Sequence, residues 1–228
     1  MAVLALLPSP LLGGEVWEPV AGLLRESGRR AEAVHLDDRV PLSVREVLDD
    51  YLAVLPADEE YVLVPHSNAG LYVPALTRHR RVAAVVFVDA GLPPLGGGEA
   101  PVVPAELRPM LVGMADEQGM LPVWTEWWDE DEVRGLFPDP AVRAAVEQQQ
   151  RRLPLTYFED TIDVPQGWAD RPCAYLSFGE GYASEAAEAR RAGWPVQTLD
   201  GEHLEMLVHP GRVSEAIVML LGEAGRRS

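Results

Sequence analysis

The sequence predicts an α/β fold in which about six mostly parallel strands form a sheet flanked by helices. Strand-like segments alternate with segments of helical periodicity, which is the pattern of a parallel sheet covered by helices. The run VAAVVFV at 82–88 is apolar throughout, as a central parallel strand should be. The alternation stops between 91 and 170 and then resumes. We therefore expect a single domain, 1–228, with 91–170 inserted in it.

Residues that commonly begin or end strands and helices support the predicted boundaries of the individual elements. The first strand, at 3–7, ends at Pro8, and the helix at 16–27 stops before Gly28, a residue type common after helix ends. The other elements before the insertion are a strand at 31–36, a helix at 44–55, a strand at 61–64, a helix at 71–77 and a strand at 82–88. Those after it are a strand at 173–177, a helix at 184–192, a strand at 195–199 and a helix at 213–221.

The insertion at 91–170 is rich in Pro, Gly, Trp and acidic residues, with one clear helix near 140–151. A structureless loop of this length is rare in a compact domain, and long insertions are usually functional. Ligands of parallel sheets bind at the carboxyl ends of the strands. We therefore predict that the insertion, which follows the strand ending at Asp89, forms a cap over those ends.

The composition limits the partners and the compartment. The chain carries 36 acidic and 19 basic residues, a formal net charge of −17, which repels nucleic acids and anionic membranes. No apolar run approaches the ~20 residues of a membrane helix, and the first strand lacks the flanks of a signal peptide. The single cysteine, Cys173, fits a reducing compartment. We expect a cytoplasmic protein that binds neither nucleic acid nor membrane.

Ser67 is the candidate nucleophile. It lies directly after the strand at 61–64 and before the helix at 71–77, with the small residues Ala69 and Gly70 behind it. A nucleophile elbow needs this context, because the tight turn admits only small neighbours and exposes the serine oxygen above the sheet. The alternative is a serine that merely caps the helix. The strand–turn–helix context favours the nucleophile.

His203 is the candidate general base. It lies between the strand at 195–199 and the last predicted helix, and it completes the order serine, acid, histidine along the chain. The alternative is a surface histidine, which is our interpretation of His209. His66 adjoins Ser67 and cannot point to the same place, so we expect it to pack beside the turn.

Three motifs occur in a fixed order. PSPLLGG at 8–14, with Trp17 after it, follows the first strand; Pro-His-Ser-Asn-Ala-Gly lies at 65–70; His203 lies in the last loop. Together they resemble the α/β-hydrolase superfamily from end to end, most closely its small esterase and hydroxynitrile-lyase branch, which has Gly-His-Ser-x-Gly-Gly at the serine. Pro65 replaces the first glycine, a position that only closes the turn. The resemblance implies the α/β-hydrolase fold and a serine-based catalytic triad.

The loop after the first strand departs from this family. Pro10 stands where the family uses a backbone N–H as half of its oxyanion hole, and proline has no N–H. The N–H of Leu11 is the candidate replacement, and the N–H of Asn68 is the second expected donor. Losing one such donor costs about 10²–10³ in rate, so this loop bears directly on activity.

Two residues compete for the acid of the triad. The family usually places an aspartate after the strand at 173–177, where this chain has Glu180, and glutamate is a known variant. Asp89 ends the strand before the insertion, and some lipases of the superfamily carry their acid there. The alternatives are a turn cap at Asp89 and a solvated loop acid at Glu180. We favour Asp89 because Gly91 and Pro93 keep its loop tight.

Three tryptophans, Trp124, Trp127 and Trp128, lie close together in the insertion. On a helix, Trp124 and Trp128 would share a face by their i, i+4 spacing, with Trp127 near it. We expect this face to cover Ser67 and to bind an apolar acyl group, because ligand pockets are mostly apolar. The alternative is that the tryptophans pack a small helical lid.

These residues predict a serine esterase or thioesterase that acts on a small hydrophobic or aromatic acyl group through an acyl-enzyme on Ser67. The expected partner is a small-molecule ester or thioester, free or bound to a carrier protein. No metal-ligand spacing and no phosphate-binding loop occurs, so we expect no metal and no cofactor. The alternatives are an acyltransferase, favoured by a dry cap, a binding protein without catalysis, suggested by Pro10, and a lyase.

Overall fold

Six parallel strands form the central sheet of the computed structural model, which describes residues 2–37 and 39–227. Along the sheet they follow the order β2-β1-β3-β4-β7-β8, so β3 lies between β1 and β4 near the middle. The strands are β1 (Val3–Leu7), β2 (Ala31–Ala33), β3 (Glu60–Ser67), β4 (Arg81–Ala90), β7 (Cys173–Phe178) and β8 (Val196–Leu199). The predicted parallel sheet with flanking helices is confirmed.

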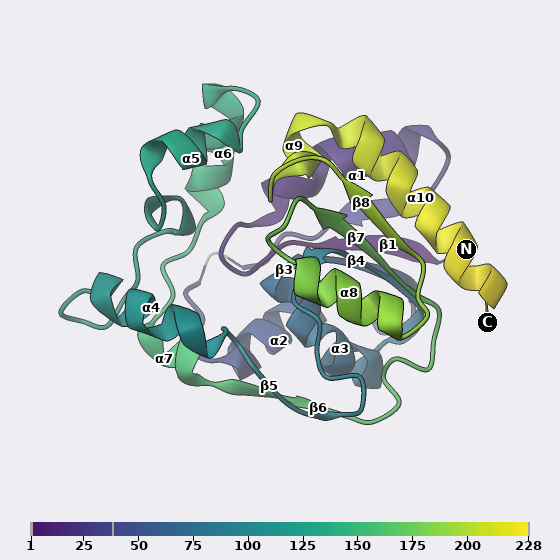
Figure 1. Cartoon of the computed structure of the whole chain (residues 1–228), viewed down its shortest axis with the longest axis horizontal. Helices are drawn as coiled ribbons and strands as arrows, with labels where there is room; N and C mark the ends of the chain where they lie inside the picture. The colour runs from purple at the N-terminus through teal and green to yellow at the C-terminus, as the bar shows by residue number, and fades with distance from the viewer. Residues whose placement is uncertain (1, 38, 228) are drawn as a thin grey trace.

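Helices cover both faces of this sheet. Figure 1 shows α1 and α10 together on one face and α2, α3 and α8 on the other. The helices are α1 (Glu18–Glu26), α2 (Val44–Val54), α3 (Val73–His79), α8 (Ala183–Arg191), α9 (Glu205–Val208) and α10 (Pro210–Arg227), with 3₁₀ turns η1 (Gly14–Trp17) and η2 (Asn68–Tyr72). Within the described residues, no helix is long and apolar enough to cross a membrane.

The core lies between the central strands and these helices. β1 is buried along its whole length, and β4 is buried from Ala84 to Ala90. Strands that are covered on both faces read as continuous apolar runs, which is why their positions can be predicted from the sequence.

β3 is longer than its apolar run predicts. The sequence predicts a strand at 61–64, yet β3 continues through Pro65 and His66 to Ser67. Proline usually ends a central strand because it cannot donate to the ladder. Here β3 keeps its register with β1 at Pro65, and its register with β4 shifts between His66 and Ser67. β4 also extends past its predicted end and includes Asp89.

The insertion contains more structure than the sequence predicts. The expected helix near 140–151 is α6 (Pro140–Gln149), and its first amides donate to the side chain of Asp139. The shorter elements carry too few residues to show a period. They are the antiparallel pair β5 (Gly98–Pro101) and β6 (Thr161–Val164), the helices α4 (Arg108–Met114), α5 (Glu130–Gly135) and α7 (Leu155–Glu159), and the turns η3 (Ala105–Leu107) and η4 (Trp124–Glu126).

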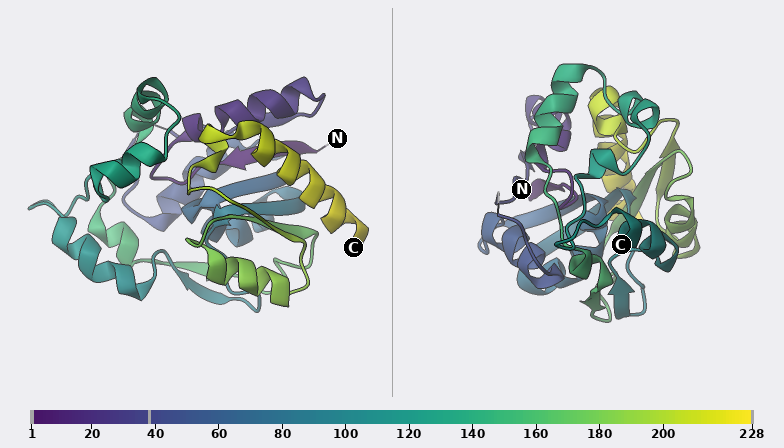
Figure 2. Two further views of the ribbon diagram at one scale, coloured as in Figure 1. Left: turned by 45° about the horizontal axis from the view of Figure 1, so that its top comes forward. Right: turned by 90° about the vertical axis from the view of Figure 1, so that its left-hand side faces the viewer.

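The helices of the insertion lie at the carboxyl ends of the central strands. Figure 2 shows α4, α5 and α6 beyond the arrowheads of the sheet. This is the side on which parallel sheets bind ligands, so the site is to be sought between the strand ends and the insertion.

Candidate active site

Ser67 ends β3 in a backbone conformation that side chains rarely adopt. Its φ is 56° and its ψ is −129°, and among the described non-glycine residues only Asp89 shares a positive φ. Such conformations persist where the surrounding structure enforces them, and they cluster at functional sites. The side chain of Ser67 makes no capping hydrogen bond to η2, so helix capping does not account for this serine.

Close packing behind Ser67 accounts for the small residues of the turn. A Cβ on Gly70 would lie 2.1 Å from the carbonyl oxygen of Gly91, so no larger residue fits there. The N–H of Gly91 in turn donates to the carbonyl of Ser67 at 3.0 Å. Ala69 is fully buried. The end of β4 therefore holds the turn in place.

His203 and Asp89 lie in direct contact. His203 Nδ1 is 2.7 Å from Asp89 Oδ2, and Asp89 Oδ1 accepts the backbone N–H of Phe178 at 2.9 Å. Asp89 is only 1% exposed. A carboxylate at Nδ1 fixes the tautomer and leaves Nε2 free to accept a proton. Glu180 is exposed in the loop after β7, and among the described residues no hydrogen bond joins it to His203.

His66 is fully buried beside the pair. Its Nε2–H donates to the backbone carbonyl of His203 at 2.9 Å, and the two rings lie 4.4 Å apart. Burial lowers the pKa of His66 well below its usual value, so this imidazole is neutral. It packs beside the turn, as the sequence suggests, and it also holds the loop that carries His203. The sequence gives no signal for that contact.

Tyr182 is a site residue that the sequence analysis does not identify. Its hydroxyl lies 3.3 Å from Ser67 Oγ, and its ring stacks on His203 with 5.5 Å between centroids and 18° between planes. Burial raises the pKa of Tyr182 to about 12. Among the described residues no hydrogen bond joins Ser67 to His203, so the serine hydroxyl has the tyrosine as its partner. The only sequence signal is the pair of glycines, Gly179 and Gly181, that precede Tyr182.

The two expected oxyanion donors differ in their surroundings. The N–H of Leu11 donates to Ser9 Oγ at 3.3 Å, so Leu11 would have to give up this long hydrogen bond to serve a substrate. Asn68 begins η2, and the first N–H groups of a helix have no partner within it. The carbonyl of Pro10 accepts a hydrogen bond from Arg151 Nε at 3.3 Å, which connects the loop to the insertion.

The three tryptophans do not share one helical face. Only Trp124–Glu126 form a 3₁₀ turn, and the indole N–H of Trp127 donates to the carbonyl of Pro122. Trp124 is 9% exposed, and its ring lies 5.8 Å from that of His203. Trp128 is 38% exposed and contacts Trp124 at 6.3 Å. Trp127 packs on Phe158, so Trp124 alone of the three contacts the ring of His203.

The side chain of Asn68 connects the turn after Ser67 to the insertion by hydrogen bonds. Its Nδ2 donates to the carbonyl of Val102 at 2.8 Å, and its Oδ1 accepts from the hydroxyl of Tyr157 at 2.7 Å. Tyr157 also bonds to the hydroxyl of Tyr72 at 2.8 Å. Val102 and Tyr157 belong to the insertion, and Tyr72 belongs to η2. The side chain of Asn68 is thus held by two residues of the insertion, Val102 and Tyr157.

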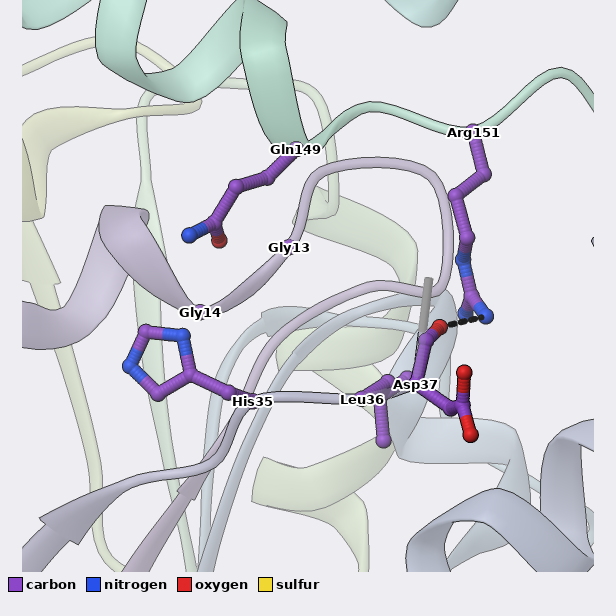
Figure 3. Close-up of a pocket in the computed structure, with 7 residues that line it drawn as sticks. All are labelled: Gly13, Gly14, His35, Leu36, Asp37, Gln149 and Arg151. Atoms are coloured by element: carbon purple, nitrogen blue, oxygen red, sulfur yellow. Dashed lines mark hydrogen bonds between the residues drawn. The ribbon is translucent and has the colours of Figure 1, made fainter. Parts of the chain in front are cut away.

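A small cavity lies outside this cluster. Figure 3 shows the residues that line it, among them Gly13 and Gly14 of the first loop and Gln149 and Arg151 of the insertion. Its volume is about 160 Å³. Within 2–37 and 39–227, no group of three or more His, Cys, Asp or Glu side chains could hold a metal ion.

No protein-family model and no curated protein matches the sequence. Solved structures do match along the whole chain. One is tomato methylketone synthase I complexed with 2-tridecanone, at 17% identity and a TM-score of 0.75, covering 98% of each chain. Another is an extracellular α/β-hydrolase from a Paenibacillus species, at 17% identity and a TM-score of 0.71, covering 96% of this chain and 99% of that one. The chain has the α/β-hydrolase fold. Polyneuridine aldehyde esterase is also similar, at 15% identity and a TM-score of 0.67, over 96% of this chain and 99% of its own.

The positions of the candidate residues suit the α/β-hydrolase fold. In this fold the nucleophile sits on a strained turn between a strand and a helix, and the acid and the histidine follow it in that order. Here Ser67 ends β3, Asp89 lies at the end of β4, and His203 follows β8.

Proposed function

We propose that this chain is an esterase or thioesterase that works through an acyl-enzyme on Ser67. The observation that carries the proposal is the buried Asp89–His203 pair beside a serine held in a strained turn. A nucleophile, a base and a group that orients the base are the components of this chemistry. The likeness to a named esterase of the same fold agrees with it.

In the proposed reaction Ser67 Oγ attacks the acyl carbon and its proton passes to His203 Nε2. The bond between the acyl carbon and the leaving oxygen or sulfur breaks, and His203 returns the proton to that atom. Water then repeats both steps and releases the acid and the free serine. Asp89 orients the imidazole and stabilises its charged form. The N–H of Asn68 stabilises the oxyanion, with Leu11 as second donor once it leaves Ser9.

The acyl group is proposed to be small and hydrophobic or aromatic. Trp124 contacts the ring of His203, with Trp128 against it, and Trp127 extends the aromatic cluster to Phe158. Apolar surfaces of this kind bind apolar ligands by excluding water. The similar tomato structure holds 2-tridecanone, an apolar ketone, which agrees with an apolar substrate.

One observation favours acyl transfer as a second candidate. Ser67 is only 8% exposed, and a site that excludes water preserves an acyl-enzyme for another acceptor. Activity that increases when an alcohol or thiol is added, with the corresponding ester or thioester as product, would identify a transferase. Release of free acid alone would identify a hydrolase.

Covalent labelling by a fluorophosphonate tests the proposal. Ser67 should form the adduct, with loss of fluoride, and intact-mass analysis should show one modification per chain. The Ser67→Ala variant and the urea-unfolded chain are the controls, and neither should react. Labelling that persists in Ser67→Ala, or no labelling of the folded protein, would leave a binding protein as the better interpretation.

A further inference from the structure

Tyr182 contacts both the nucleophile and the base of the proposed function. Its hydroxyl is 3.3 Å from Ser67 Oγ and its ring lies flat on the imidazole of His203. Tyr182 follows β7, on the side of β3 away from β1 and the oxyanion loop. Its hydroxyl is therefore on the same side of Ser67 as His203.

That position is where the leaving atom of a substrate belongs. The leaving atom is bonded to the carbon that Ser67 Oγ attacks, and it receives its proton from His203. It must therefore lie within hydrogen-bond reach of the imidazole and close to the serine oxygen. A hydroxyl that sits beside Ser67 Oγ, on a ring stacked against His203, occupies this place.

We propose that Tyr182 is a gate on the leaving-group side of the site. In the resting protein its hydroxyl holds Ser67 Oγ, and a substrate must displace it before the serine can bond to His203. The phenol ring then limits the size of the leaving group. This inference rests on the proposed function of Ser67 and His203.

Two further properties of Tyr182 agree with such a gate. Burial raises its pKa to about 12, so the phenol is protonated at neutral pH and can donate to Ser67 Oγ. The 3.3 Å distance is long for an O–H···O hydrogen bond, which is usually about 2.7–2.8 Å, so displacing it costs little.

The first experiment compares labelling rates of the full chain with a fluorophosphonate. Tyr182→Phe keeps the ring and removes the hydroxyl, so Ser67 should react faster, by roughly two- to tenfold, the value of one neutral hydrogen bond. Ser184→Ala, an exposed residue two positions further along the chain, is the matched control and should react like the wild type. Equal or slower labelling of Tyr182→Phe would overturn the gate.

The second experiment varies the leaving group at constant acyl group. For a methyl and a benzyl ester of one aromatic acid, Tyr182→Ala should raise the benzyl-to-methyl ratio of kcat/KM by roughly tenfold or more, the scale on which pocket size discriminates substrates. Tyr182→Phe should keep the wild-type ratio, because its ring remains. An unchanged ratio in a folded Tyr182→Ala would show that the ring does not limit the leaving group.

The outcomes separate this inference from the proposed function. If the wild type labels at Ser67 and Tyr182→Phe labels no faster, only the gate is rejected. If neither forms an adduct, the acyl-enzyme is rejected and the gate with it. If Tyr182→Ala does not fold, the labelling rate of Tyr182→Phe by itself tests the gate.

Discussion

Ser67 and Asp89 owe their orientation to the same backbone feature. Both have a positive φ, 56° and 42°; Ser67 ends β3, and Asp89 is the last residue but one of the neighbouring β4. A conformation of this kind costs roughly 1–3 kcal/mol at a residue other than glycine. Hydrogen bonds from Gly91 N–H to the carbonyl of Ser67 and from Phe178 N–H to Asp89 Oδ1 help to hold it. The strain is therefore located at the two residues that we propose as the nucleophile and the acid.

Substitutions of Asp89 and Glu180 should have very different effects on activity. Asp89→Asn is expected to lower kcat/KM by about 10² or more, because loss of the correct histidine tautomer costs up to ~10⁴. Glu180→Gln, the matched control, should stay within about threefold of the wild type, since an exposed loop residue that does not contact His203 contributes little. Steady-state kinetics of both variants on one ester measures the difference. A larger loss of kcat/KM in Glu180→Gln would assign the acid to Glu180 instead of Asp89.

The sequence identifies candidates more readily than contacts. Ser67, Asp89 and His203 each follow a recognisable strand, so each can be named in advance. β7 lies between β4 and β8, so Asp89 meets His203 only because the loop after β8 reaches back to the end of β4, across 114 positions of sequence. Tyr182 could not be identified as a site residue, because a tyrosine after two nearby glycines indicates no function in the sequence. Its role depends on the loop that places its ring against His203.

At the scale of elements, the insertion is bonded to the sheet on two sides of the serine turn. On one side Asn68 bonds to Val102 and Tyr157. On the other, Arg151 bonds to the carbonyl of Pro10 at 3.3 Å and to Asp50 at 3.4 Å. Both attachments are largely buried, where a broken hydrogen bond is costly. The insertion is therefore attached to the sheet at both places, whereas Tyr182, the residue proposed to move, lies outside it.

Alanine variants of Trp124 and Trp128 should show whether these side chains contact the substrate or only pack the protein. Trp124→Ala is expected to lower kcat/KM for an ester with a bulky aromatic acyl group by about 10- to 100-fold more than for an acetyl ester, the value of burying one aromatic side chain. Trp128→Ala, more exposed and in contact with Trp124, should change this ratio less. Equal losses for both esters, together with a lower Tm, would show that Trp124 only packs.

The insertion is also where the sequence predicts least. Outside it the central strands contain continuous buried apolar runs, as in β1 and in β4 from Ala84, and the alternation of strands and helices makes their order predictable. Within it, α5 and α7 each span only a few residues, too few for a period of 3.6 to appear. The tryptophan stretch shows the consequence: the indole of Trp127 bonds back to Pro122 and the chain bends where a helix would continue.

At the scale of the whole molecule, stability and pH are linked through the buried centre. The surface carries a large acidic excess, with a net charge of −17, whereas His66 lies fully buried next to His203 and Trp17. Burial keeps the pKa of His66 well below its usual value. The unfolded chain therefore binds a proton that the folded protein does not.

His66 should make the protein less stable in mild acid. Its contribution is fully present above the unfolded pKa of about 6.5 and is lost as pH falls towards the lower folded pKa, at up to about 1.4 kcal/mol per pH unit. Urea unfolding at about pH 7.5 and about pH 5.5 measures this for the wild type and His66→Gln. The free energy of unfolding should fall more steeply in the wild type, and equal slopes would contradict the assignment.

The separation of Asp89 from His203 along the chain also bears on when the protein can become active. Contacts between distant segments form late, because the entropy of closing a long loop must be paid first. During synthesis Ser67 and Asp89 leave the ribosome before the segment that carries His203. Until that segment docks, the proposed nucleophile lacks its proposed base, so reactivity is expected to appear only when β8 and the loop after it complete the sheet.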